Sequence, residues 1–211
     1  MTAITGLSTR HRMENIRRFE PMYPYVYNPT YHYDPFRNAI PNPNPYPSPN
    51  NANANTSANA RAHAEIKGSP LAPNLRGYVK FTDVPNGTRV SVRVMGLPSY
   101  QEAQNDQAPI GPHGFHIHED GACSIGDNSD PYQSAGGHWS PDDQPHGNHA
   151  GDFPVLFSNN GHARMTFFTD RFKSSDVTGK SIIIHQNPDD YRTQPAGDAG
   201  KRIGCGVINA Y

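Results

Sequence analysis

The sequence predicts an all-β domain, an antiparallel sandwich or barrel over residues 63–211, preceded by a disordered arm over residues 1–62. Three observations favour this organisation. Short runs of alternating hydrophobicity recur between turn signals after residue 62, no amphipathic helix of useful length is present, and the composition changes sharply near residue 62. A domain of about 150 residues is long enough to bury an adequate core.

The predicted arm is rich in Pro, Tyr, Asn and Ala. Residues 21–49 contain nine of the 21 Pro and six of the 11 Tyr, and residues 50–60 read NNANANTSANA. Neither stretch has the hydrophobic period of a helix or strand, and closely spaced Pro favours extended polyproline II. Residues 1–20 contain four Arg but no apolar stretch of a secretory signal, so no signal peptide is predicted. The arm is interpreted either as an adhesive or cross-linkable tether to a surface layer, or as a solvated tail without a specific partner.

The strand signals begin with a hairpin. The segments GYVKFT and TRVSVRVM alternate, with Val90, Val92 and Val94 on one face, and VPNG between them is typical of a turn. Long loops rich in Gly, Pro and Asp are expected at 119–153 and 186–203. The predicted strands are 77–82, 88–95, 114–118, 163–168, 181–185 and 204–208.

The charge and hydropathy of the chain exclude two classes of protein. With 18 basic and 19 acidic residues the net charge is −1, which excludes a globally basic nucleic-acid binder. Mean hydropathy is −0.77, and no apolar run approaches the ~18 residues of a membrane span. Residues 63–211 alone carry 12 basic and 16 acidic residues, a net charge of −4.

Histidine is the most informative residue type, because six of the 11 His lie between positions 113 and 149. In GFHIHE, strand alternation places His116 and His118 on the same face, opposite Phe115 and Ile117. Two imidazoles roughly 7 Å apart along a strand can bind one metal ion. This pattern alone is weak, since many such pairs are surface residues.

The segment GGHWSPDDQPHGNHAGD is a stronger metal signal. His138, His146, His149 and Asp152 offer three nitrogens and one carboxylate, the donor set of a tetrahedral Zn²⁺ site, and the surrounding Gly and Pro let the loop curl around an ion. The alternative is a His-rich polar loop; the neighbouring H-x-H strand favours metal binding. His185, at the end of SIIIH, is by itself more typical of a satisfied or exposed residue.

The two cysteines allow three interpretations: a disulfide, a pair of inert thiols, or soft metal ligands. No C-x-x-C motif is present, which disfavours a zinc ribbon or a thioredoxin-like site. A bridge between Cys123 and Cys205 would close a loop of about 80 residues, worth on the order of 4–5 kcal/mol in the chain-entropy model, and would indicate an oxidising compartment.

Five segments in this order resemble copper/zinc superoxide dismutases, of the bacterial-type branch, over about residues 64–211. They are HGFHIHE (113–119), AGGHWSP (135–141), HAGDFP (149–154), IIIHQNPDDY (182–191) and GDAGKRIGCGVI (197–208). The resemblance implies a Greek-key antiparallel β-sandwich or flattened barrel with long metal-binding loops. It leaves the arm unmatched.

The resemblance also implies a ligand set, with one copper and one zinc per chain. Copper would be bound by His116, His118, His138 and His185. Zinc would be bound by His138, His146, His149 and Asp152, with His138 bridging the two metals. Cys123 and Cys205 would form a disulfide, Asp189 would join a copper ligand to a zinc ligand from outside, and His113 would tie loops together without binding metal.

The implied reaction converts superoxide to O₂ and H₂O₂ by copper redox cycling, with structural zinc. Arg202 would attract and orient superoxide, and His138 would leave the reduced copper, take up a proton and later deliver it. Lys201 and Arg192 are weaker candidates for steering the anion. The expected partner is thus a small anion, with no nucleic acid and no membrane span.

One departure from the family stands out. Only Gly147 and Asn148 separate His146 from His149, and this short loop is expected to strain the zinc site or weaken zinc binding. It leaves open a non-catalytic metal-binding or surface-layer protein on the same fold. An extracytoplasmic, cell-surface or spore-surface location, a homodimer, and a tethering role for the arm are further expectations.

Overall fold

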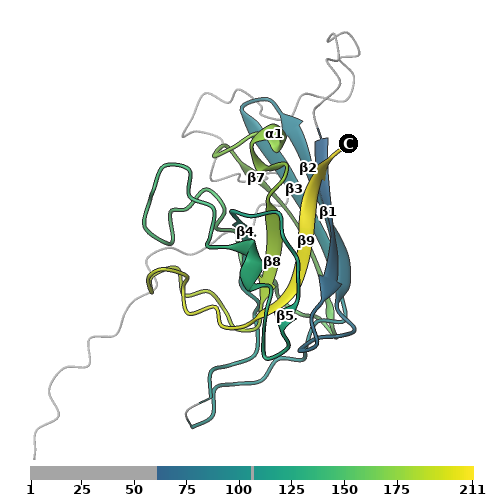
Figure 1. Cartoon of the computed structure of the whole chain (residues 1–211), viewed down its shortest axis with the longest axis vertical. Helices are drawn as coiled ribbons and strands as arrows, with labels where there is room; N and C mark the ends of the chain where they lie inside the picture. The colour runs from purple at the N-terminus through teal and green to yellow at the C-terminus, as the bar shows by residue number, and fades with distance from the viewer. Residues whose placement is uncertain (1–60, 106) are drawn as a thin grey trace, which may run out of the picture. The chain divides into compact units, whose positions relative to one another are not determined.

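The computed structural model describes residues 61–105 and 107–211, and these residues form an almost entirely β structure (Figure 1). One short helix, α1 (Ser174–Val177), and one 3₁₀ turn, η1 (Gln133–Ala135), interrupt the strands. The strands are β1 (Arg61–Gly68), β2 (Arg76–Val84), β3 (Gly87–Met95), β4 (Phe115–His118), β5 (Gly126–Asp127), β6 (Asp130–Pro131), β7 (His162–Thr169), β8 (Ser181–His185) and β9 (Arg202–Ala210). The predicted all-β class is confirmed.

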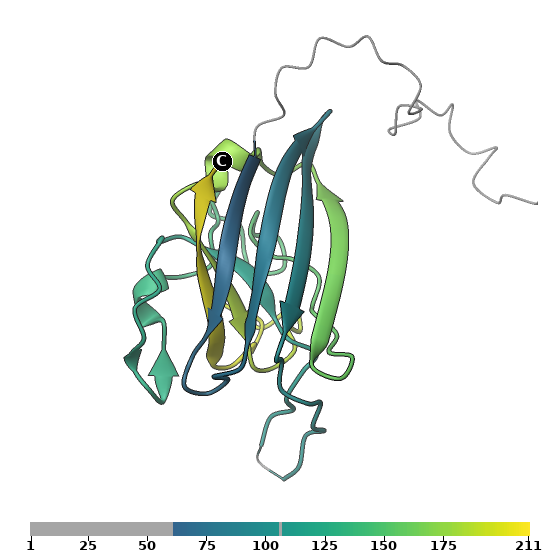
Figure 2. The ribbon, with the colours of Figure 1, turned by 90° about the vertical axis from the view of Figure 1, so that its right-hand side faces the viewer.

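Seven of the strands form one antiparallel sheet in the order β4-β8-β9-β1-β2-β3-β7, while β5 and β6 pair separately. The sheet curls about its long axis, so that its inner face wraps the core (Figures 1 and 2). The predicted hairpin is confirmed: β2 and β3 pair from Arg76 opposite Met95 to Val84 opposite Gly87. Asn86 turns the chain with a φ of 66°, a left-handed conformation that Asn tolerates.

The core lies on the concave face and follows strand alternation. Val90, Val92 and Val94 are buried there together, as the sequence predicts. Phe153 and Phe172, from the connections around β7, close the core against the sheet with Trp139.

Strand β1 was not among the strands that the sequence predicts. Ala62, Ala64 and Ile66 alternate as buried positions, but two of the three are small and give little hydrophobic signal. The strand pairs with β2 on one side and β9 on the other. The domain therefore includes Arg61 and Ala62, which the predicted boundary at residue 62 assigned to the arm. The remainder of the predicted arm lies outside the described residues.

Strand β4 lies at one end of the sheet and is buried on both faces. Phe115 and Ile117 belong to the core, whereas His116 and His118 point to the opposite face. The loop after η1 pairs with the edge of β4 that β8 leaves open, through backbone bridges from His116 to Asp152 and from His118 to His138. This loop and the strand together build the candidate site. No helix in the described part of the chain is long and apolar enough to cross a membrane.

Candidate metal centre

Four histidines from three separate segments meet beside β4. His116 and His118 come from β4, His185 from the end of β8, and His138 from the covering loop; one ring nitrogen of each lies within 4.8 Å of the others. Between them, His118 Nε2 and His185 Nε2 are 3.3 Å apart. We call these four residues the first donor cluster. The register of β8 against β9 shifts between Ile184 and His185, at the point where His185 enters the cluster.

Each strand histidine has an acceptor on the outer side of its ring. His116 Nε2 donates to Asp189 Oδ2 at 2.6 Å, His118 Nδ1 to the Gly136 carbonyl at 3.0 Å, and His185 Nδ1 to the Gly200 carbonyl at 3.1 Å. A carbonyl or carboxylate accepts only from a protonated ring nitrogen, which assigns the proton to the outer atom. The inner nitrogen of each ring therefore carries a lone pair directed into the cluster.

A second donor cluster adjoins the first and shares one residue with it. His138, His146, His149 and Asp152 bring one ligand atom each to within 4.8 Å of the others. His138 Nδ1 faces Asp152 Oδ1 at 3.2 Å, whereas its Nε2 is buried with no hydrogen-bond partner. The ring of His138 thus contributes to both clusters.

The short loop between His146 and His149 closes around one oxygen of Asp152. Asp152 Oδ2 accepts hydrogen bonds from the backbone N–H of Gly147 at 2.8 Å and of His149 at 3.1 Å. Gly147 has a φ of 88°, a conformation that side chains other than Gly rarely adopt. Asp152 Oδ1 then faces the ring nitrogens of His138 and His149. The two-residue spacing is therefore compatible with convergence of all four side chains.

Asp189 connects the two clusters from behind. Its Oδ2 accepts from His116 and its Oδ1 accepts from His146 Nε2 at 2.8 Å, with the Tyr191 backbone N–H as a further donor to Oδ1 at 2.7 Å. Both histidine contacts are fully buried. One carboxylate thus orients one ring in each cluster, which is the position that the family resemblance implies for it.

Burial keeps the first donor cluster neutral. Desolvation, reinforced by the charge that neighbouring histidines would carry, lowers the pKa of His116 and His118 well below 6.5 and that of His185 to about 3. Burial also lowers the pKa of His138, although Asp152 opposes the shift. Neutral imidazole is the form that ligates metal ions, so the rings are prepared for a cation.

The unpaired donor atoms fit two cations. Within the two donor clusters, four buried ring nitrogens have no hydrogen-bond partner, an arrangement that costs free energy unless something binds them. They are His116 Nδ1, His138 Nε2, His146 Nδ1 and His149 Nδ1. An all-imidazole set suits copper, and three imidazoles with one carboxylate suit tetrahedral zinc.

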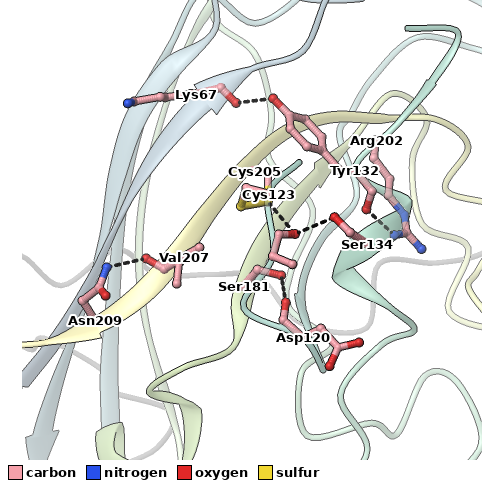
Figure 3. The surroundings of a disulfide bond; sticks show 11 residues. Lys67, Asp120, Cys123, Tyr132, Ser134, Ser181, Arg202, Cys205, Val207 and Asn209 are labelled. Carbon is pink, nitrogen blue, oxygen red and sulfur yellow. Dashed lines mark hydrogen bonds between the residues drawn. A yellow bond between two sulfur atoms is a disulfide. The ribbon is translucent and has the colours of Figure 1, made fainter. Parts of the chain in front are cut away.

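Arg202 lies beside the first donor cluster, at the start of β9. Its Nη1 donates to the Tyr132 carbonyl at 2.7 Å (Figure 3). Its Nη2 donates to the Gly136 carbonyl at 2.8 Å, and the two contacts fix the guanidinium. The Gly136 carbonyl also accepts from His118, so a single backbone oxygen orients both residues. Burial lowers the pKa of Arg202, yet the group remains a cation.

The disulfide implied by the resemblance is present. Cys123 and Cys205 are bonded, with Cα atoms 5.7 Å apart, and join the loop after β4 to strand β9 (Figure 3). Cys205 packs with Tyr132 and Ile183 in a small buried cluster under that loop. The bond therefore anchors the segment that presents the carbonyls of Tyr132 and Gly136 to Arg202.

The chain is similar to proteins of known activity. The family model described as copper/zinc superoxide dismutase matches residues 75–208. The chain belongs to the copper/zinc superoxide dismutase family. It is 39% identical over 151 residues to superoxide dismutase [Cu-Zn] of Deinococcus radiodurans, covering 64% of this chain and 77% of that protein. It is 36% identical over 140 residues to the Legionella pneumophila protein of the same name, covering 63% and 76%.

A solved structure agrees with this assignment. The Cu/Zn superoxide dismutase of Brucella abortus superposes with a TM-score of 0.56 at 28% identity, covering 70% of this chain and 98% of the other. The predicted family, and its bacterial-type branch, are confirmed.

Several supporting residues of this superoxide dismutase family site were not predicted. Gln194 brackets the backbone of His146, accepting its N–H at 2.8 Å and donating to its carbonyl at 3.2 Å. Arg171 donates to the His149 carbonyl at 2.6 Å. Because these side chains bind backbone atoms rather than donor groups, no motif marks them in the sequence.

Two predicted residues lie apart from the clusters. His113 donates from Nδ1 to the His185 carbonyl at 2.9 Å, and its backbone pairs with Leu156, so it joins two loops without entering either donor cluster. Lys201 is paired with Asp130 at 3.2 Å on the surface, which reduces its value for attracting an anion.

Proposed function

We propose that the protein is a superoxide dismutase that converts two superoxide ions and two protons into O₂ and H₂O₂. It would hold one copper in the first donor cluster and one zinc in the second. The observation that carries the proposal is the position of His138, whose two ring nitrogens belong to two adjacent donor sets. A single imidazole shared in this way suits paired redox and structural ions better than one isolated site.

The protein's own residues prepare the site for metals. When bound, copper supplies a one-electron couple that oxidises one superoxide to O₂ and reduces a second to peroxide, while zinc supplies fixed charge. His116, His118 and His185 are held by outer hydrogen bonds, so their inner lone pairs need no reorganisation. The second cluster offers a closed set of four donors, as structural zinc requires.

Arg202 binds and orients the anion. A guanidinium has five N–H donors, and the two carbonyl contacts leave others free for an oxygen anion beside His118 and His185. Residues 63–211 are net acidic, which disfavours the long-range approach of superoxide. A fixed local cation is therefore needed to concentrate the substrate at the site.

His138 is the residue that supplies a proton. Of the four residues of the first donor cluster, it alone also belongs to the second, and its Nδ1 faces Asp152 Oδ1 at 3.2 Å. Its Nε2 has no hydrogen-bond partner and can hold a proton before passing it to the reduced substrate.

The test uses full-length protein reconstituted with copper and zinc, with bound metals counted per chain and superoxide decay followed directly. We expect rapid decay that slows with added salt. Arg202→Gln should lower the second-order rate about 10-fold or more, and Arg202→Lys should retain part of it, because Lys keeps the charge without the two-carbonyl contact. His185→Ala should remove copper-dependent turnover. Full metal loading without superoxide consumption would refute the proposal.

We infer an extracytoplasmic or surface location as part of this function, since the disulfide is stable in oxidising compartments. Cell fractionation with antibody detection tests it. Deleting residues 1–60 tests the proposed tether: localisation should be lost while dismutase activity persists. Analytical ultracentrifugation over a range of concentrations tests the proposed homodimer.

A further inference from the structure

The outer face of strands β1, β2, β3 and β7 collects most of the positive charge of the domain. In Figure 2 these strands face the viewer, and no other described element crosses in front of them. Seven basic side chains and a single acidic one, Glu65, alternate outward here. The rest of residues 61–211 contains six basic and 15 acidic residues. Positive charge is therefore concentrated on this face, although the net charge of the domain is negative.

Four of these cations form a stripe across the sheet. In the strand register Lys67 lies directly opposite Arg76, and Arg93 lies directly opposite Arg164. Arg76 and Arg93 are diagonal neighbours on β2 and β3. The stripe crosses three strand spacings, about 14 Å. Arg61, Lys80 and Arg89 continue the positive charge on one side of it.

The stripe carries an unfavourable electrostatic feature. Like charges directly opposite on neighbouring strands are destabilising. Among residues 61–105 and 107–211, the Lys201–Asp130 contact is the only ion pair between a Lys or Arg and a carboxylate, so no cation of the stripe is directly paired with a described carboxylate. A bound polyanion would offset the repulsion.

A hollow of about 520 Å³ lies in the middle of the stripe. Lys67, Arg76, Arg93 and Met95 line it, together with Glu65 and Tyr78, which lie opposite each other in the register. It thus combines three cations for anionic groups with a carboxylate and a phenol that can hydrogen-bond hydroxyl groups.

We propose that this face, which we call the basic face, binds an acidic polysaccharide whose sugars carry carboxylates, a polyuronate. Planar guanidinium groups pair bidentately with planar carboxylates, and the arginines of the stripe present them in series. Glu65 accepts hydrogen bonds from the sugar hydroxyls. The enzyme would thereby be held on a surface polymer with its metal centre directed elsewhere.

Other occupants fit the basic face less well. Single-stranded nucleic acid needs a series of open aromatic platforms, but Tyr78 is the one aromatic residue that lines the hollow, and Lys80 Nζ lies 5.3 Å from its ring centroid. A lipid surface calls for a group of exposed apolar side chains, whereas the exposed large apolar residues of this face, Tyr78 and Phe168, lie on β2 and β7 with β3 between them. The segment 1–60 has five basic and three acidic residues, so its charge does not complement this face.

The test measures binding of full-length protein to an oligogalacturonate of defined length by calorimetry at low salt. The affinity of the variant Arg76→Gln/Arg93→Gln/Arg164→Gln for the uronate should be lower by a factor on the order of 10 or more. The slope of log K against log salt concentration should be shallower by about 2, because three cations are removed. The variant should unfold at an unchanged or slightly higher temperature, because repulsion is relieved. The matched control is Arg12→Gln/Arg17→Gln/Arg18→Gln, which changes the net charge equally outside the described residues and should bind normally.

Four outcomes would overturn the proposal. The first is an equal loss of affinity in the control variant, which would place binding elsewhere. The second is tighter binding to single-stranded DNA or to phosphatidylglycerol vesicles than to the uronate. The third is that the triple substitution suppresses self-association of the protein and changes nothing else that is measured. The fourth is absence of uronate binding at low salt. None of these measurements depends on dismutase activity, so failure here leaves the proposed function standing.

Discussion

Removing the Cys123–Cys205 bond should destabilise the domain strongly, and the structure sets the magnitude. The cysteines are 82 residues apart in sequence. In the chain-entropy model, a cross-link that closes a loop of this length raises the free energy of unfolding by about 4.5 kcal/mol. Small domains commonly have only about 5–15 kcal/mol in total. The metal-free Cys123→Ala/Cys205→Ala variant should therefore be close to its stability limit.

The assay is equilibrium unfolding in urea with a chelator present, so that metal binding does not mask the difference. Trp139 is the only tryptophan and is buried in the core, which makes its fluorescence a direct report on the domain. With a slope of about 2 kcal/mol per molar urea, the midpoint should fall by about 2 M. Reduced wild-type protein is the matched control, because it lacks the bond but keeps both sulfur atoms. A midpoint shift below about 0.5 M in both proteins, at an unchanged slope, would refute the loop-closure argument.

Three further predictions concern the metal centre. Asp189→Asn should weaken zinc binding 10- to 100-fold, because the two histidine rings donate to different carboxylate oxygens and the amide replaces one of these acceptors with an NH₂ donor; competitive titration with a chromophoric chelator measures this. Gly197→Ala should disrupt the same contact, since Gly197 has a φ of 64° and an added Cβ would collide with the Asp189 carboxylate; zinc content per chain reports it. Metal-free protein should lose stability as the pH falls below about 6.5. The pKa of His185 is about 3 in the folded protein, so between pH 6.5 and about pH 3 its ring takes up a proton only in the unfolded state. The free energy of unfolding therefore falls by about 1.4 kcal/mol for each pH unit and for each such histidine.

Each of these predictions has a specific control. Asp198→Asn changes the same functional group in the same loop at an exposed position, and its φ of 51° suits Asn, so zinc affinity should not change. For Gly197, substitution of exposed Ser175 by Ala should leave zinc content at the wild-type level. For the pH dependence, a flat stability curve between pH 6.5 and 4 would mean that the buried histidines are protonated in the folded protein.

The sequence was informative where side chains carry the chemistry. His116 and His118 could be placed on one face by strand alternation, and the loop containing His146 and His149 was recognisable from its donor groups and glycines. Assigning His185 needed the family resemblance, because nothing local distinguishes it from an ordinary histidine at a strand end. In the fold, the strands rich in Val and Ile were predicted, whereas the alanines of β1 produced too little hydrophobic contrast.

The support of the site could not be predicted, because much of it is backbone. The carbonyl of Gly136 orients both His118 and Arg202, and any residue type would offer the same oxygen. What selects that oxygen is the path of the loop, which depends on η1 and on the disulfide many residues away. The pattern of residue types along the sequence does not specify the path of this loop.

The short loop between His146 and His149 shows how backbone contacts determine what a side chain can do. Asp152 Oδ2 accepts from two N–H groups of the loop and also faces His146 Nδ1 at 3.4 Å, while Oδ1 faces the rings of His138 and His149. A longer loop would not need that anchor, whereas here the carboxylate is both part of the closure and part of the donor set. Loss of the loop contacts would therefore free Asp152 to rotate, and the second donor cluster would lose its only oxygen donor. The short spacing is expected to weaken zinc binding, but the contacts that it creates with Asp152 oppose this effect. Zinc affinity should therefore depend on Asp152 more than on the length of the loop.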